Sequence, residues 1–115
     1  MTAADILTDL FRIQPSFRAY WEHTNHFVGD DGSFTACGVF SQFTNFFRAH
    51  HEKMKKDELQ AIAALISQCE KNESLREAAY ACSLENIAGD PPDLTLSPFL
   101  STQAIEFCTH WRTAP

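Results

Sequence analysis

Glycine and basic residues are scarce in this sequence, and both shortages bear on function. Only four of the 115 residues are glycine, and no glycine-rich loop of the kind that cradles phosphates is present. Nine Lys and Arg residues stand against fifteen Asp and Glu residues, and residues 77–111 contain no Lys or Arg at all. Nucleic-acid binding usually needs a basic face that releases counterions. We therefore expect no nucleic-acid partner. The excess of acidic residues would instead favour a basic partner, or simply keep the protein soluble.

Closely spaced cysteines and long apolar runs are also missing. The four cysteines lie more than ten residues apart and form no CxxC pair; they are Cys37, Cys69, Cys82 and Cys108. No stretch approaches the length of a transmembrane helix. The sequence start lacks the basic region and apolar run of a signal peptide. We therefore expect a cytoplasmic protein that binds no membrane, with four reduced and buried thiols.

Strand-like alternation does not persist anywhere, whereas apolar residues recur at helical spacing along most of the chain. The sequence therefore predicts an all-α fold in one domain, residues 1–115, since this length suits a single core. About six antiparallel helices are expected, arranged either as a right-handed α-α stack of the armadillo/HEAT type or as an irregular helical bundle. The burial prediction covers Phe40, Phe43, Phe47, Leu59, Ile62, Ile66, Cys82, Phe107 and Trp111.

Local signals predict where the helices begin and end. Thr2 and Asp5 have the spacing of a capping box, and Pro15 ends the first helix near Ile13. Two glycines and two aspartates in residues 29–33 predict a turn, after which Ser33 can cap the third helix. Gly38 inside that helix suggests a close helix crossing. The fifth helix is expected over residues 75–87.

The prolines near the C-terminal third should separate the last two helices. Pro91 and Pro92 are expected to exclude helix, because each lacks a backbone donor. The connection then runs to about Ser97, and Pro98 opens the last helix.

Two histidines provide the best case for an enzyme. His23 and His26 are three residues apart, which can place two imidazoles on one helical face for a metal ion. A metal-assisted hydrolase is therefore one alternative, although no third ligand is identifiable and the pair can equally face water at a helix end. Cys37 or Cys82 could act as a nucleophile, but neither has the sequence setting of an activated thiolate. The sequence favours a protein without enzymatic activity and predicts no cofactor.

The segment "FFRAHHEKMKKDELQAIAALIS", followed by "SLENI" and "SPFLSTQAIEFCTHW", resembles a loosely defined set of small uncharacterised bacterial all-helical proteins. Some of these resemble armadillo/HEAT-like helix stacks, and others resemble immunity proteins that block toxins. The similarity runs from Ile6 to Trp111, and the pair Pro91-Pro92 departs from it. The resemblance implies a helix-stack fold and a non-enzymatic function, and it transfers no catalytic residue.

Together these observations predict a protein-binding module. An immunity-type inhibitor of a basic partner is the most specific form, and a purely structural homodimer is an alternative. Aromatic side chains that could stay exposed as anchors are Phe27, Phe34, Phe46 and Phe99. The predicted interaction residues are Glu85, Asn86, Asp90, Asp93 and Phe99, although Glu85 and Asn86 can equally serve the end of their helix.

Overall fold

The computed structural model describes residues 1–23 and 25–112, and within them it contains helices and no strand. This confirms the all-α prediction. In chain order the helices are α1 (Ala3–Ile13), α2 (Ser16–Glu22), α3 (Ala36–His50), α4 (Lys56–Cys69), α5 (Glu73–Ala79), α6 (Glu85–Ile87), α7 (Pro91–Leu96) and α8 (Thr102–Arg112). A π-helical turn, Tyr80–Leu84, joins α5 to α6 without a break. Residues 73–87 are therefore called the α5–α6 rod.

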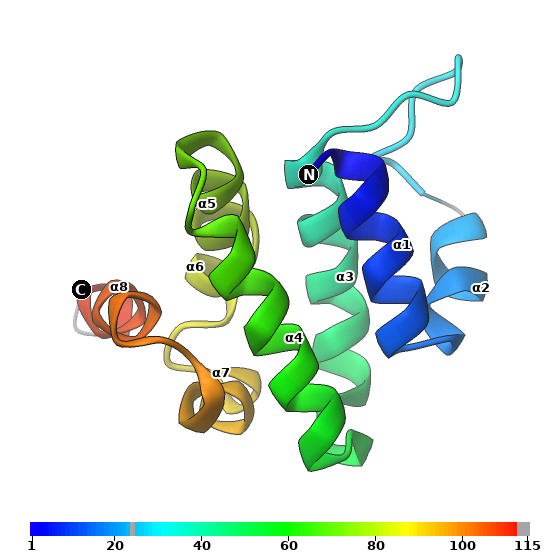
Figure 1. Cartoon of the computed structure of the whole chain (residues 1–115). Coiled ribbons are helices and arrows are strands. Elements are labelled where there is room, and N and C mark those ends of the chain that lie inside the picture. The colour runs from blue at the N-terminus through cyan, green and yellow to red at the C-terminus, as the bar shows by residue number, and fades with distance from the viewer. Residues whose placement is uncertain (24, 113–115) are drawn as a thin grey trace.

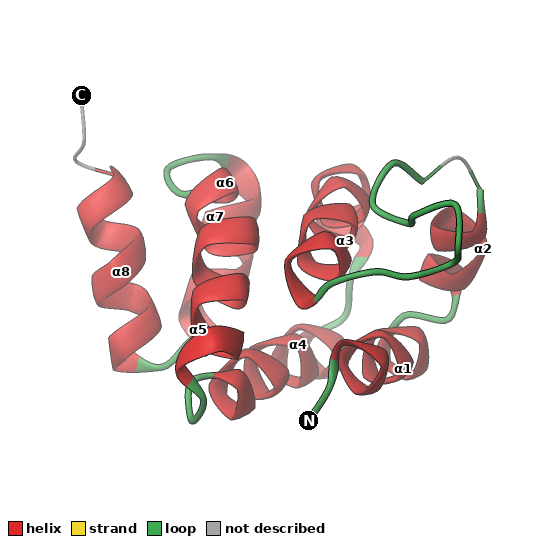
Figure 2. Cartoon of the chain, turned by 90° about the horizontal axis from the view of Figure 1, so that it is seen from above, coloured by secondary structure: helices red, strands yellow, loops and turns green. Residues whose placement is uncertain are grey.

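The helices form two layers. Figure 2 shows α1 and α4 in one layer, with α2, α3 and the α5–α6 rod in the other. Helix α8 lies at the end of the molecule away from α2 (Figure 1), where it contacts the π-turn and α6. Along the described residues no helix is both long and apolar enough to cross a lipid bilayer.

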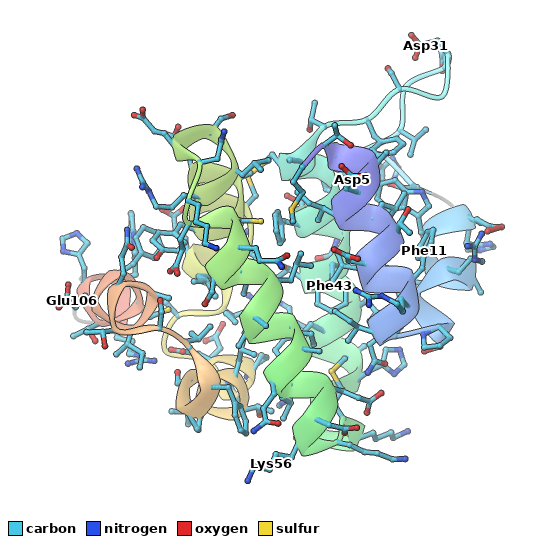
Figure 3. The ribbon with its side chains drawn as sticks, in the orientation of Figure 1. Asp5, Phe11, Asp31, Phe43, Lys56 and Glu106 are labelled. Carbon is cyan, nitrogen blue, oxygen red and sulfur yellow. A yellow bond between two sulfur atoms is a disulfide. The ribbon has the colours of Figure 1, made fainter. Side chains whose placement is uncertain are left out.

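The core is built around aromatic rings from α2 and α3. Phe17 is fully buried, and its ring centroid lies 5.1 Å from that of Phe43 and 5.4 Å from that of Phe46. Phe43 is labelled in Figure 3, at the centre of the side chains. Fully burying one such side chain contributes about 1.5–3 kcal/mol. This cluster holds α2 against α3, and it explains why Phe46, a predicted anchor, is buried instead.

Six of the nine residues predicted to be buried are buried: Phe40, Phe43, Phe47, Leu59, Ile62 and Ile66. The prediction is wrong for the other three. Cys82 and Phe107 are half-buried, and Trp111 is 39% exposed. Phe107 and Trp111 belong to α8, which is covered from one side only because it ends the row of helices.

The predicted capping box at the start of α1 is confirmed. The Thr2 hydroxyl accepts a hydrogen bond from the Asp5 amide, and the Asp5 carboxylate accepts one from the Thr2 amide. The third helix begins two residues later than expected, since Thr35 rather than Ser33 caps it. Gly38 faces the loop between α2 and α3, where an added Cβ would come within 3.1 Å of the Phe27 Cβ. The absence of a side chain at Gly38 therefore makes room for Phe27 of this loop, and not for a crossing helix as predicted.

The proline prediction was wrong. Pro91 and Pro92 open α7 and do not exclude it. The first-turn amides of a helix have no intrahelical partner, so a missing N–H is tolerated there. Gly89, at φ +85°, ends the preceding rod and turns the chain into α7. This short helix brings the number of helical rods in the described residues to seven, one more than the sequence predicted.

Asp93 anchors α7 to α8. Its side chain is 0% exposed, and both carboxylate oxygens lie 2.6 Å from nitrogens of the Arg112 guanidinium. The Ser97 hydroxyl and the Gly89 amide also donate to it, at 2.6 and 2.8 Å. Burial alone raises the pKa of a carboxyl, but here these donors outweigh it and hold the pKa of Asp93 below its ordinary value.

The thiol prediction was half wrong. Cys37 and Cys82 form a disulfide between the first turn of α3 and the π-turn, with their Cα atoms 5.4 Å apart. The two residues are 45 positions apart in the chain, so spacing gave no hint that they would meet. Cys69 and Cys108 are free and buried, and burial raises the pKa of each thiol to about 11.

Candidate binding site

The structure separates the residues predicted to form one interaction surface. Asn86 and Asp90 lie together around Arg48, which donates to the Asn86 carbonyl and pairs with the Asp90 carboxylate at 3.1 Å. The Asn86 amide also donates to the Cys82 carbonyl at 3.2 Å, so Asn86 does serve the end of its helix. Glu85 lies apart from them and lines a groove that is described next.

The other two predicted residues fit a surface role poorly. Asp93 is inside the protein and paired with Arg112, so it cannot face a partner. Phe99 is half-buried and packs against the core.

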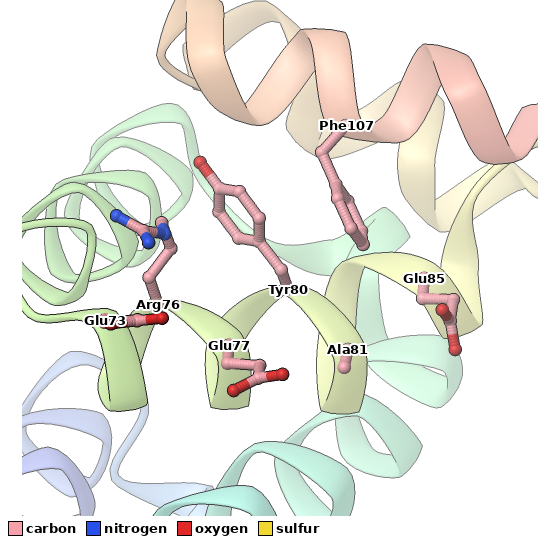
Figure 4. A pocket seen from close by; sticks show the side chains of 7 residues that line it. All are labelled: Glu73, Arg76, Glu77, Tyr80, Ala81, Glu85 and Phe107. Atoms are coloured by element: carbon pink, nitrogen blue, oxygen red, sulfur yellow. The ribbon is translucent and has the colours of Figure 1, made fainter.

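A groove of about 310 Å³ runs between the α5–α6 rod and α8. Figure 4 shows its lining, of which every residue except Phe107 comes from the rod: Glu73, Arg76, Glu77, Tyr80, Ala81, Glu85 and Phe107. The groove lies beside the place where α8 packs against the π-turn and α6.

Two aromatic rings form the floor of this groove. The ring centroids of Tyr80 and Phe107 are 4.7 Å apart. The Tyr80 hydroxyl donates to the Glu70 carboxylate, which also accepts a hydrogen bond from the Ser101 hydroxyl at 2.7 Å. Burial, reinforced by the Glu70 carboxylate, raises the pKa of Tyr80 above its ordinary value. Tyr80 is therefore a neutral phenol that is fixed in place at the floor of the groove.

Carboxylates form the rim. Glu73 and Glu77 are exposed and Glu85 is half-buried, and none of the three pairs with a described Lys, Arg or His within 4 Å. Arg76 is the one basic lining residue, and its guanidinium donates to the Glu70 carbonyl at 3.3 Å. The lining therefore carries three negative groups against one positive group.

The π-turn places these carboxylates on one face. Glu73, Glu77, Ala81 and Glu85 follow one another at intervals of four residues. Each such interval in an α-helix passes a full turn by about 40°, so a regular helix would carry Glu85 about 120° away from Glu73. A π-turn closes its hydrogen bond one residue later, which offsets part of that drift. The four-residue spacing of acids was therefore the signal that sequence reasoning missed.

A second cleft of about 310 Å³ lies on the other side of the rod, against the start of α3. The disulfide cysteines line it together with Thr35, Ala36, Ser74, Glu77, Ala78 and Ala81. Glu77 and Ala81 thus line both depressions. In the apolar interior, a cavity among Leu10, Phe43 and Leu96 measures only about 10 Å³.

The structure does not bring His23 and His26 together on a helical face. His23 follows the last residue of α2, and His26 lies in the loop beyond it; both are exposed. Across the described residues no three His, Cys, Asp or Glu side chains are grouped so that they could hold a metal ion. Cys37 and Cys82, the candidate nucleophiles, are bonded to each other.

Comparison of the chain with models of protein families, with curated proteins and with solved structures gave no match.

Proposed function

We propose that this protein is a protein-binding module that receives a basic segment of another protein in the groove between the α5–α6 rod and α8. The observation that carries the proposal is an aromatic floor, Tyr80 and Phe107, bordered by three carboxylates that pair with no basic side chain among the described residues. Aromatic faces attract Lys and Arg side chains. An apolar centre with a charged rim is also the usual anatomy of a protein interface.

Charge supports a basic occupant over an acidic one. The rim acids Glu73, Glu77 and Glu85 outnumber Arg76, and the whole chain carries −6. Opposite charge steers a partner to its site and speeds encounter. An immunity-type inhibitor, acting in the cytoplasm on a basic toxin of bacterial origin, is the specific form of this proposal.

The test begins with selection of random 12-residue peptides displayed on phage, on the wild-type protein and on the Phe107→Ala variant. We expect peptides that bind only the wild type to be enriched in Lys and Arg. Enrichment of acidic peptides, or the same selected set on both proteins, would overturn the proposal.

The affinities of the selected peptides for groove variants then test whether the peptides bind in the groove. By fluorescence anisotropy at low salt, Glu77→Gln and Glu85→Gln should each weaken binding about two- to fivefold, which is the effect of one exposed charge pair. Glu106→Gln on α8 is the matched control, because it removes the same charge from an exposed residue that does not line the groove. Equal losses in all three variants would show that only net charge matters and would refute a groove.

Self-association is a second candidate, and exposed apolar side chains on the last two helices favour it. Leu94 of α7 and Trp111 of α8 are both exposed. Light scattering coupled to sizing chromatography measures the mass directly. A dimer that Trp111→Ser converts to a monomer would support this candidate, and a monomeric wild type would reject it.

A further inference from the structure

The Cys37–Cys82 disulfide lies at the surface of the molecule, beside the second cleft. Cys37 is exposed and Cys82 is half-buried, and both line that cleft of about 310 Å³. Disulfides that a thiol can reach are the labile ones, whereas buried ones persist. Position therefore distinguishes this pair from the buried thiols Cys69 and Cys108.

The surroundings of Cys37 favour a thiolate at its sulfur, which makes Cys37 a good leaving group when a second thiol releases it from a mixed disulfide. Cys37 is the second residue of α3, a helix of 15 residues. Amides in the first turn of a helix lack intrahelical partners and carry the positive end of the helix dipole. The Gly38 amide is one of these first-turn amides, and it donates to the Thr35 hydroxyl at 3.0 Å. The Ser41 hydroxyl lies 3.9 Å from the Cys37 Sγ and can donate to it.

We propose that Cys37–Cys82 is a thiol–disulfide exchange site at which an uncharged or cationic small thiol bonds to the Cys37 Sγ. The cleft provides the room for such a thiol beside the disulfide. The preference for charge comes from Glu77, whose carboxylate lines the same cleft and repels an anion.

The exchange proceeds in two balanced steps. The thiolate of the incoming molecule attacks the Cys37 Sγ because Cys37 is exposed and Cys82 is half-buried, so a new disulfide forms and the Cys37–Cys82 bond breaks. Its electron pair stays on the Cys82 Sγ, which takes a proton from water. A second thiolate then attacks the sulfur of the bound small molecule, releasing a small-molecule disulfide and leaving Cys37 reduced. Two external thiols are oxidised as the protein gains two electrons, and the reverse reaction restores the disulfide.

The native protein is tested with cysteamine, a cationic thiol, in the absence of denaturant. Samples are quenched with acid and mapped by mass spectrometry. We expect a cysteamine adduct on Cys37 and then free thiols at Cys37 and Cys82, with Cys69 and Cys108 unmodified and the circular-dichroism spectrum still helical. Reduction that needs denaturant, or an adduct on Cys82 alone, would overturn the proposal.

Two single variants form a matched pair, because each lacks the disulfide and keeps one of its cysteines. With cystamine, Cys82→Ser should form the mixed disulfide at Cys37 about tenfold faster than Cys37→Ser forms it at Cys82. Equal rates contradict the assignment of Cys37. Where a variant fails to fold, the mapping of the wild-type adduct decides.

Charge selectivity is measured on the wild type. At low ionic strength 2-mercaptoethanesulfonate, an anionic thiol, should react about two- to fourfold more slowly than cysteamine, after correction for the rates of both with a model disulfide. Glu77→Gln should reduce the difference between the reaction rates of these two thiols. Corrected rates that are equal on the wild type would refute the preference for uncharged and cationic thiols.

Discussion

Replacing Arg112 with methionine isolates the ion pair that joins α7 to α8. The change removes the guanidinium but keeps most of the apolar stem of the side chain. The Asp93 side chain is 0% exposed in the wild type, and without Arg112 its remaining side-chain and backbone donors among the described residues are Ser97 and Gly89. A buried charge that loses its partner is among the most destabilising defects in a folded protein.

The expected loss follows from the geometry. Removing one member of a buried ion pair costs about 3–5 kcal/mol. The Arg112 side chain is 27% exposed, so water can reach part of the site, and two hydrogen-bond donors to Asp93 remain. We therefore expect Arg112→Met to lower the free energy of unfolding by about 2–4 kcal/mol. Arg48→Met is the matched control, because Arg48 and Asp90 are 41% and 52% exposed and such surface pairs contribute about 0–1 kcal/mol.

The loss should also depend on pH. In the wild type the lowered pKa of Asp93 stabilises the fold above the unfolded-state pKa of about 3.9, and this stabilisation is lost as the pH falls through the folded-state value. Without Arg112 we expect the pKa of Asp93 to rise, because burial is then opposed only by Ser97 and Gly89, and protonation then relieves the variant of its buried charge. The difference between wild type and variant is therefore largest at pH 7 and narrows toward pH 4.

Urea denaturation followed by circular dichroism at pH 7 and pH 4 measures this difference. The double variant Asp93→Leu/Arg112→Met should recover much of the loss, because it removes both charges from the interior. The reasoning is refuted if Arg112→Met costs no more than Arg48→Met at pH 7, or costs the same at both pH values.

Three further perturbations address the disulfide, the core and the first helix. Cys37→Ser with Cys82→Ser should lower the free energy of unfolding by about 4 kcal/mol, since the bond closes a long loop in the unfolded chain; a loss under 1 kcal/mol in urea denaturation would contradict this. Phe17→Ala should cost about 3–5 kcal/mol because the ring is fully buried, and Phe17→Leu should cost clearly less in the same assay. Thr2→Ala should cost about 1 kcal/mol, or about 4 °C in melting temperature, through loss of the capping box. Thr2→Ser keeps the hydroxyl and should have the same melting temperature as the wild type.

The fold class and most helix positions could be predicted because their causes are local. The capping box at Thr2 and Asp5 lies within one turn of chain, and the apolar spacing that builds α4 needs only its own 14 residues. The proline error was also local, since Pro91 and Pro92 were read as helix breakers at positions where a helix begins. Position within the first turn decides which role a proline takes.

The site could not be predicted to the same degree because its residues meet only in three dimensions. Phe107 comes from α8 and Tyr80 from the π-turn, 27 positions earlier. Asp93 was predicted to lie at the surface because its partner Arg112 is 19 positions away in the chain, and nothing in the sequence shows that the two residues meet. Of the predicted interaction residues only Glu85 lines the groove. The spacing of Glu73, Glu77 and Glu85 was readable, but the π-turn that keeps them on one face has no local signature we can identify.

The π-turn also bears on how this sequence can change over evolution. Such a turn holds one residue more than the α-helix that it interrupts, so a single-codon deletion within Tyr80–Leu84 is the smallest event that could straighten it. The deletion would leave Glu85 eleven positions after Glu73 in a regular α-helix, which is about 20° more than three full turns, so the two halves of the rod would keep their relative orientation. Straightening the turn without a deletion would instead carry Glu85 about 120° away from Glu73 and off the rim. In an alignment, relatives with a single-residue gap within Tyr80–Leu84 should therefore still carry the acids of the groove on one face.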